Sequence, residues 1–259
     1  MISSTCPHIL VDQENRVLNI QFNRLDRKNA LSLAMYSSLA DIITQANQTA
    51  GIRVLVLKGH NEFFTSGNDL VDFMNDAVIR DDHPVVRFMN ALSQSSKPVV
   101  AIVRGHAIGI GTTLLLHCDL VYAAEDARLQ LPFVNLGLCP EYASSYLLPR
   151  LMGKAKASEL LLLGEHFSGR TAAELGIITA ALPWDELQEY ADEKIKRLGA
   201  QPPAAVKRTK ALLMATQASA INECLRAEYI AFAEGLMSEE CKESITAFFE
   251  KRTPDFSRF

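Results

Sequence analysis

The chain has 259 residues, of which 48% are hydrophobic and 22% charged, and its formal net charge is −4. It is long enough to bury a large core, and its acidic balance excludes the basic excess that is typical of nucleic-acid-binding proteins. No apolar run is long enough to span a membrane and the N-terminus lacks a signal-peptide pattern, so we expect a cytoplasmic protein without a membrane partner. The five cysteines are scattered without paired spacing. They favour free thiols over disulfides or a zinc site.

The first predicted elements are a strand and a helix joined by a polar loop. Residues 16–22 alternate between apolar and polar types, which is the pattern of a half-buried strand. Residues 23–31 are polar enough to predict a loop. Ser32 can then cap a helix whose apolar residues recur every three or four positions.

A second strand is predicted over residues 53–58, and it leads to a turn over residues 65–70. Gly67 and Asn68 in this turn are the residue types that most readily accept a positive φ or a tight turn. Two interpretations remain open. The turn can simply close a strand-to-helix connection, or it can direct the Asn68 N–H into a cavity, because a neighbouring glycine lets a ligand approach the backbone closely.

The middle of the chain predicts a surface stretch, a helix and a buried strand. Residues 75–83 are polar and predict a mobile surface stretch that can supply a cover for a ligand site. A helical pattern over residues 85–94 ends before Pro98, where the apolar strand 98–103 begins.

A glycine-rich turn follows this strand, and it opens an apolar segment that extends to Asp119. Strand, glycine turn and helix is the predicted order. The free N–H groups at such a helix N-terminus favour negative charge, so an anionic group is expected there.

Short strands at 120–124 and 127–131 continue the alternation of strands and helices, which indicates an α/β core. The last third of the chain is predicted to be helical. We divide the chain into a core at residues 1–200 and a helical C-terminal region at residues 201–259. The helices are expected at residues 154–163, 171–175 with Gly176 as a stop, 186–198, 204–217 and 218–251.

Most familiar catalytic patterns are missing from the sequence. There is no Gly-x-Ser-x-Gly elbow, and His106 is a lone histidine at a strand end, so a Ser/His hydrolase is disfavoured. No His or carboxylate pair has the spacing of metal ligands. The glycines at 105, 109 and 111 match neither a dinucleotide fingerprint nor a phosphate-binding loop.

Glu141 is the remaining chemical candidate. One interpretation is that Pro140 and Glu141 begin a helix, since proline suits the first position and an acid complements the helix dipole. The other is that Glu141, flanked by apolar residues such as Leu138 and Tyr142, lies in an apolar cavity. Desolvation there would raise its pKa and make it a proton shuttle near neutral pH.

Several segments together resemble the enoyl-CoA hydratase/isomerase, or crotonase, superfamily across nearly the whole chain. They are residues 23–31, 64–70, 97–101, 105–109, 118–119, 136–138 and 248–254. The resemblance implies an α/β fold made of a spiral of ββα units, a helical C-terminal region used in trimerisation, and an acyl-CoA ligand.

By motif position, the resemblance makes the backbone N–H groups of Asn68 and Ile110 the two donors that hold the thioester oxygen as it becomes an enolate. Hydratases of the family use two glutamates to activate water, and the matching positions here are Thr113 and Phe133. The segment 139–145 instead resembles the part of 3,2-enoyl-CoA isomerases, especially the peroxisomal type, that holds the catalytic glutamate. Glu141 is the corresponding residue.

The implied reaction is a 1,3-proton shift that converts a 3-enoyl-CoA into a trans-2-enoyl-CoA, with no cofactor or metal beyond the CoA of the substrate. Glu141 takes the proton from C2 and returns it at C4. The implied partners are the acyl-CoA and further copies of the chain in a trimer or hexamer. Arg252 is an alternative to Lys251 as a contact to the ligand of a neighbouring subunit. The residues expected to contact the substrate are Arg24, Asp26, Lys28, Ala30, Ser66, Gly67, Asp69, Leu70, Gly109, Thr113, Phe133 and Lys251.

Two alternatives remain open at this point. One is another crotonase reaction, such as hydration of an enoyl-CoA. The other is a non-catalytic acyl-CoA-binding or protein-binding module on the same scaffold, which the presence of Glu141 and both glycine turns disfavours.

Overall fold

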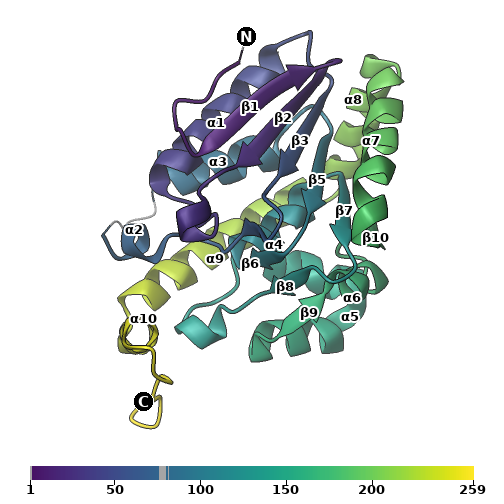
Figure 1. Ribbon diagram of the computed structural model, residues 1–259. Helices are drawn as coiled ribbons and strands as arrows, with labels where there is room; N and C mark the ends of the chain where they lie inside the picture. Colours follow the sequence, from purple (N-terminus) through teal and green to yellow (C-terminus); the bar gives the residue numbers. More distant parts are fainter. Residues whose placement is uncertain (1, 76–79, 81) are drawn as a thin grey trace.

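The computed structural model describes residues 2–75, 80 and 82–259, and in this part of the chain the strands form two sheets (Figure 1). The six-stranded sheet has the order β1-β2-β3-β5-β7-β10, and its strands are parallel except for the β1–β2 pair. The four-stranded sheet has the order β4-β6-β8-β9, with β9 antiparallel to β8. The strand bounds are β1 Ile9–Glu14, β2 Val17–Phe22, β3 Val54–Lys58, β4 Phe63–Thr65, β5 Val99–Val103, β6 His106–Ile108, β7 Leu120–Ala124, β8 Arg128–Gln130, β9 His166–Ser168 and β10 Ala180–Leu182.

From β3 to β8, consecutive strands alternate between the two sheets, so the chain follows a spiral path. The strands β3, β5 and β7 enter the large sheet, and the strand after each of them, β4, β6 or β8, enters the small sheet before the chain turns into helical segments. Every residue of β5 is buried. A continuous apolar run of this kind is typical of a parallel strand that is covered on both faces.

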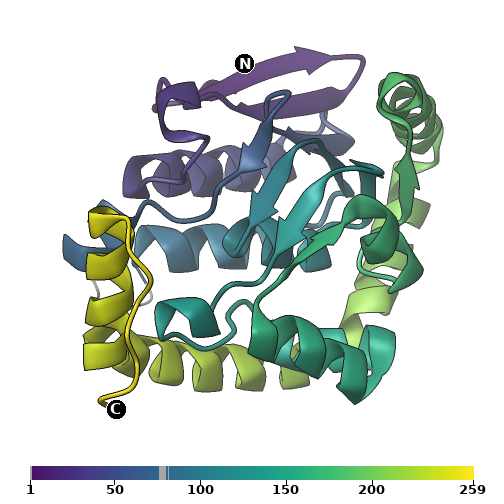
Figure 2. The ribbon, with the colours of Figure 1, turned by 60° about the horizontal axis from the view of Figure 1, so that its bottom comes forward.

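Helices cover the sheets and form most of the C-terminal third. Figure 2 shows α1 and α3 as neighbouring layers beneath the large sheet, with α9 running along their far side and α10 turning away at its end. The helix bounds are α1 Leu33–Gln48, α2 Leu70–Asn75, α3 Pro84–Ser93, α4 Ile110–Thr113, α5 Ser144–Leu163, α6 Gly169–Glu174, α7 Trp184–Ala200, α8 Pro203–Ala215, α9 Ala218–Met237 and α10 Glu239–Glu250.

The α/β class is confirmed, and so are several local predictions. The Ser32 hydroxyl accepts a hydrogen bond from the Met35 N–H at 3.3 Å and caps α1, as expected. The helix predicted at residues 186–198 corresponds to α7, in which the buried side chains Leu187, Ala191 and Ile195 form an apolar stripe.

Other predictions about the elements were wrong. The segment after the glycine turn is not one helix, because β6 pairs with β4 and β8 before the single turn of α4 and a 3-10 helix at Leu114–His117. The predicted helix 218–251 is two helices, since Ser238 ends α9 and caps α10 by accepting from the Cys241 N–H at 3.0 Å. The predicted helix 154–163 is confirmed as the part of α5 that follows a break at Gly153, whereas the part before this break, from Ser144, was not predicted. The strands β1, β4, β9 and β10 were not predicted.

The predicted surface stretch 75–83 falls partly on residues 76–79 and 81, which lie outside the described residues. At its end His83 is buried, with 5% of its surface exposed, because its ring caps α3 by accepting from the Val85 N–H. For His83, the prediction of a surface position was therefore wrong.

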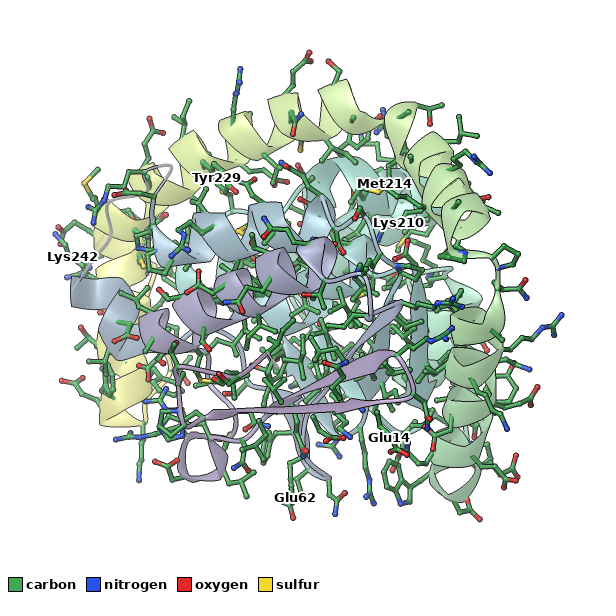
Figure 3. The ribbon with its side chains drawn as sticks, turned by 90° about the horizontal axis from the view of Figure 1, so that it is seen from above. Glu14, Glu62, Lys210, Met214, Tyr229 and Lys242 are labelled. Atoms are coloured by element: carbon green, nitrogen blue, oxygen red, sulfur yellow. The ribbon has the colours of Figure 1, made fainter. Side chains whose placement is uncertain are left out.

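An ion pair between the buried Lys210 and the partly exposed Asp119 joins α8 to the large sheet. Lys210, which Figure 3 labels on α8, lies 2.6 Å from Asp119 and also donates to the Lys97 carbonyl at 2.9 Å. The Asp119 carboxylate accepts from the Val99 N–H at the start of β5.

In the described ranges, no helix is both long and apolar enough to cross a membrane.

Candidate active site

Two glycine turns lie side by side at the carboxyl ends of parallel strands. The strands β4 and β6 pair in parallel, so the turns that follow Thr65 and Ile108 leave the small sheet at the same edge. Gly67 has φ 96° and Gly109 has φ 57°, positive values that residues other than glycine rarely adopt. A Cβ on Gly67 would lie 2.9 Å from the Ile108 carbonyl oxygen. The two turns therefore touch each other.

In the described part of the chain, the backbone N–H groups of Asn68 in one turn and Ile110 in the other have no acceptor. Ile110 is the first residue of α4, where an N–H has no partner within the helix. In the other turn, hydrogen bonds of Leu31 to Gly67 and of Asp69 to Leu31 fix the backbone on either side of Asn68. A Cβ on Gly109 would meet no atom within 4 Å, so there is open space beside this turn.

A buried tyrosine fixes the side chain of Asn68. The Tyr36 hydroxyl, on α1, donates to the Asn68 Oδ1. Tyr36 is fully buried, and burial together with the negative charge of Glu141 raises its pKa well above the ordinary value. Tyr36 therefore stays a neutral donor, and it connects one glycine turn with the surroundings of Glu141.

Glu141 is buried, with 5% of its surface exposed, and its Oε1 accepts from the Thr113 hydroxyl at 2.8 Å. Burial raises its pKa to about 8. The hydrogen bond from Thr113 lowers the pKa and the negative charge of Glu228 raises it, and both effects are smaller than that of burial. A carboxyl group with this pKa can take and return a proton near neutral pH.

The backbone that carries Glu141 is strained and tightly held. Tyr142 and Ala143 both have φ 58°, a left-handed conformation that costs about 1–3 kcal/mol for each residue other than glycine. The Tyr142 ring is buried and stacks on His117 with 3.7 Å between the ring centroids, and its hydroxyl donates to the Met89 carbonyl at 2.7 Å. Glu141 thus precedes α5, which begins at Ser144, and the interpretation of Glu141 as the start of a helix was wrong.

Glu141 faces a largely apolar cavity between α3 and α9, with about 500 Å³ of empty volume including its mouth. Figure 3 shows Tyr229 on α9 beside α3, where both helices contribute to the walls. Two further ionisable residues, Asp72 and His83, line the cavity and were missed in the sequence. The Asp72 carboxylate accepts from the Leu33 N–H at 2.8 Å and so caps α1. The lining residues are Leu33, Asp72, His83, Val85, Val86, Met89, Glu141, Tyr229, Phe232 and Leu236.

The structure brings some predicted substrate contacts close to the glycine turns. Arg24 forms an ion pair with Asp69 at 2.6 Å and donates to the Ala30 carbonyl at 3.0 Å, so its guanidinium holds the loop after β2 against the turn at Gly67. The Ser66 N–H donates to the Lys28 carbonyl, which links the same two segments. Leu70 begins α2 directly after the turn.

Other predicted contacts lie apart from Glu141 or on the surface. Phe133 is part of the buried core, with 4% of its surface exposed. Asp26 is exposed on the loop after β2. Lys251 is exposed at the C-terminal end of α10. Its neighbour Arg252 is held by ion pairs with Glu243 and Glu250.

Comparisons with known proteins agree with this geometry. Residues 12–258 match the family model described as enoyl-CoA hydratase/isomerase. The chain is 33% identical to the 2,3-dehydroadipyl-CoA hydratase of Escherichia coli, over 96% of this chain and 98% of that protein. It is 32% identical to rat enoyl-CoA delta isomerase 2, over 94% of this chain, and spans 64% of that protein's length.

A solved structure gives a similar result. The structure of Pseudomonas aeruginosa OdaA superposes with a TM-score of 0.91 at 44% identity, covering 94% of this chain and 99% of the other. The relatives thus include both a protein named as a hydratase and a protein named as an isomerase, and each is more than 30% identical to this chain.

Proposed function

The chain belongs to the enoyl-CoA hydratase/isomerase family, the crotonase superfamily, and has the fold of its members; within this family we propose that it is a 3,2-enoyl-CoA isomerase. The observation that carries the proposal is the single buried Glu141, hydrogen-bonded by Thr113 beside the two glycine turns. The positions where the family's hydratases hold two glutamates are occupied here by Thr113 and Phe133.

The proposed reaction begins when ionised Glu141 takes a proton from C2 of a 3-enoyl thioester. The electron pair released at C2 moves onto the thioester oxygen, and the N–H groups of Asn68 and Ile110 stabilise the dienolate. Protonated Glu141 then gives the proton to C4, and the double bond comes to rest between C2 and C3. The substrate and the product contain the same atoms, so the reaction needs neither water nor a redox partner.

The raised pKa of Glu141 suits both halves of this reaction. A pKa of about 8 makes the carboxylate a stronger base toward C2 than an ordinary glutamate. The protonated carboxyl group that results is the acid that then gives the proton to C4. Because most of the free enzyme is protonated at pH 7, we expect kcat/KM to rise with pH until about 8.

We place the CoA along the loop after β2 and the turn at Gly67, where Arg24, Asp26, Lys28, Ala30, Ser66, Asp69 and Leu70 lie. The acyl group then extends past Gly109 and Thr113 into the cavity of α3 and α9. Phe133 and Lys251 complete the proposed substrate contacts. The reaction needs no cofactor.

We also propose that the chain works as a homo-oligomer, a trimer or hexamer. Large apolar side chains on the C-terminal helices are exposed, among them Leu212 at 72%, Leu213 at 71%, Met237 at 67% and Phe248 at 61%. Exposed apolar area of this kind commonly marks an interface. Light scattering coupled to size exclusion measures the assembly directly, and a monomer at micromolar concentration would contradict this proposal.

The test of the isomerase proposal uses two substrates and one variant. We expect purified protein to convert a 3-enoyl-CoA into the conjugated 2-enoyl-CoA, detected by its ultraviolet absorbance, and to leave a 2-enoyl-CoA unhydrated. Glu141→Gln keeps the size of the side chain and removes the base, so it should lose nearly all activity. Rapid hydration without a double-bond shift would favour a hydratase, and binding of CoA thioesters without either reaction would favour a binding module.

A further inference from the structure

A second buried carboxylate reaches the backbone that carries Glu141. Glu228 lies on α9, 85 residues from Ala143 in the sequence, and only 6% of its surface is exposed. Its Oε2 accepts from the Ala143 N–H at 2.5 Å. Its Oε1 accepts from the Ser145 N–H at 3.0 Å and from the Ser145 hydroxyl at 2.5 Å.

These hydrogen bonds replace a local helix cap. Ala143 occupies the N-cap position of α5 and has no side-chain oxygen to bind the N–H groups of the first turn. Glu228 supplies that oxygen from another helix, and its negative charge complements the positive end of the α5 dipole. The carboxylate is therefore held at this place by the donors it satisfies.

The same contacts fix the strained residues next to Glu141. Tyr142 and Ala143 adopt left-handed conformations directly after Glu141, and such conformations persist only when the surroundings determine them. Tyr142 is held by Met89 and His117 on one side. Glu228 holds Ala143 on the other. Loss of Glu228 would free the backbone two residues from the base.

Glu228 also acts on Glu141 through its charge, because the negative carboxylate of Glu228 raises the pKa of Glu141. Burial raises the pKa of Glu228 itself, and its hydrogen bonds with Ser145, Ala143 and Cys224 lower it. Other titratable groups also face the two carboxylates from the elements packed around them. These are Tyr36 on α1, Asp72 on α2, His83 before α3, Cys139 and Tyr142 in the Glu141 segment, and Cys224 and Tyr229 on α9.

We propose that Glu228 is a positioning residue for Glu141. It holds the turn at Tyr142 and Ala143 so that the Glu141 carboxylate faces the cavity, and its charge keeps Glu141 a strong base. The effect on turnover rests on the proposed isomerase function. The effect on the titration of Glu141 does not.

Three variants separate the two effects. Glu228→Gln keeps the length of the side chain, removes the charge and replaces one of the two accepting oxygens by an NH2 group, whereas Glu228→Asp keeps the charge and both oxygens and shortens the reach. Glu223→Gln is the matched control, because Glu223 is an exposed residue of the same helix and accepts a hydrogen bond from the Ser219 hydroxyl. Circular dichroism and thermal melting establish that each variant is folded.

The first readout is the titration of Glu141 without substrate, followed by carbon-13 NMR of the glutamate carboxyl carbons and assigned with Glu141→Gln. We expect Glu228→Gln to lower the Glu141 pKa by about one unit, the size of effect that a nearby charge commonly has. Glu228→Asp and Glu223→Gln should leave it near the native value. An unchanged Glu141 pKa in folded Glu228→Gln would overturn the role of the charge.

The second readout is steady-state kinetics with a 3-enoyl-CoA. Misplacement of the base should lower kcat by about tenfold to a hundredfold in Glu228→Asp, with KM changed by less than about threefold, because Glu228 lies outside the proposed CoA contacts. Native kcat in folded Glu228→Asp would overturn the role in positioning.

Two further outcomes are covered by the same design. If the Glu228 variants do not fold, Ser145→Ala removes one of the three hydrogen bonds without changing the charge. We then expect kcat to fall several-fold, and a native kcat would overturn the proposal. If the native protein does not isomerise 3-enoyl-CoA, the isomerase function fails, and the NMR titration still decides whether Glu228 controls Glu141.

Discussion

The raised pKa of Glu141 should make the stability of the protein depend on pH in a way that one substitution removes. Folding raises this pKa from its ordinary value of 4.5 to about 8. Between these two values the folded protein binds a proton that the unfolded chain has released. The stability that this group contributes is fully present below pH 4.5 and is lost as the pH rises to 8.

The magnitude follows from the width of that window. Each pH unit inside it changes the free energy of unfolding by about 1.4 kcal/mol, so the whole window is worth about 4–5 kcal/mol. Glu141→Gln is neutral at every pH and can still accept the hydrogen bond from Thr113. The variant should therefore match the native protein near pH 4.5 and be more stable than it by several kcal/mol at pH 8.5.

The assay is urea unfolding of both proteins at half-unit intervals from pH 4.5 to 9, followed by circular dichroism. The quantity of interest is the difference between the two free energies of unfolding at each pH, because titrating groups that do not interact with Glu141 contribute equally to both proteins. A difference that does not change across this range would refute the conclusion that burial raises the pKa of Glu141.

Three further predictions concern single residues. Thr113→Val removes the hydrogen bond that favours ionised Glu141, so the acidic limb of the kcat/KM profile should move up by about half to one pH unit; an unchanged midpoint would count against this. Tyr36→Phe releases the Asn68 side chain and should lower kcat by about tenfold at nearly constant KM, whereas native turnover would show that the contact is dispensable. Lys210→Met leaves the Asp119 carboxylate, whose side chain is 27% exposed, without its cation, and should lower the free energy of unfolding by about 1–2 kcal/mol in urea; a loss below about 0.5 kcal/mol would contradict the ion pair's structural role.

The sequence predicted those parts of the fold that local patterns determine. Ser32 has a recognisable capping position, and the stripe of α7 repeats with helical period. The glycine turns were found because Gly67 and Gly109 need conformations that few other residues accept. The break at Ser238 was missed, although a serine followed by two acidic residues is a recognisable helix start.

Other features depend on contacts between distant segments. The strand β6 has only three residues and forms because β4 and β8 pair with it on both sides. The burial of His83 and its place in the cavity could not be inferred from the polar residues around it. Glu228 reads as one charged residue on an amphipathic helix, and only the packing of α9 against α5 brings it to the backbone after Glu141. Local patterns therefore indicated Glu141 but not the residues that hold it.

The most direct test of the proposed reaction is the mass and labelling pattern of the product formed from a 3-enoyl-CoA in deuterated water. The account predicts a product with no added water, conjugated between C2 and C3, whose new hydrogen lies at C4 and comes from C2 or from deuterium exchanged at Glu141. A product heavier by one water molecule, with a hydroxyl group on the acyl chain, would contradict it.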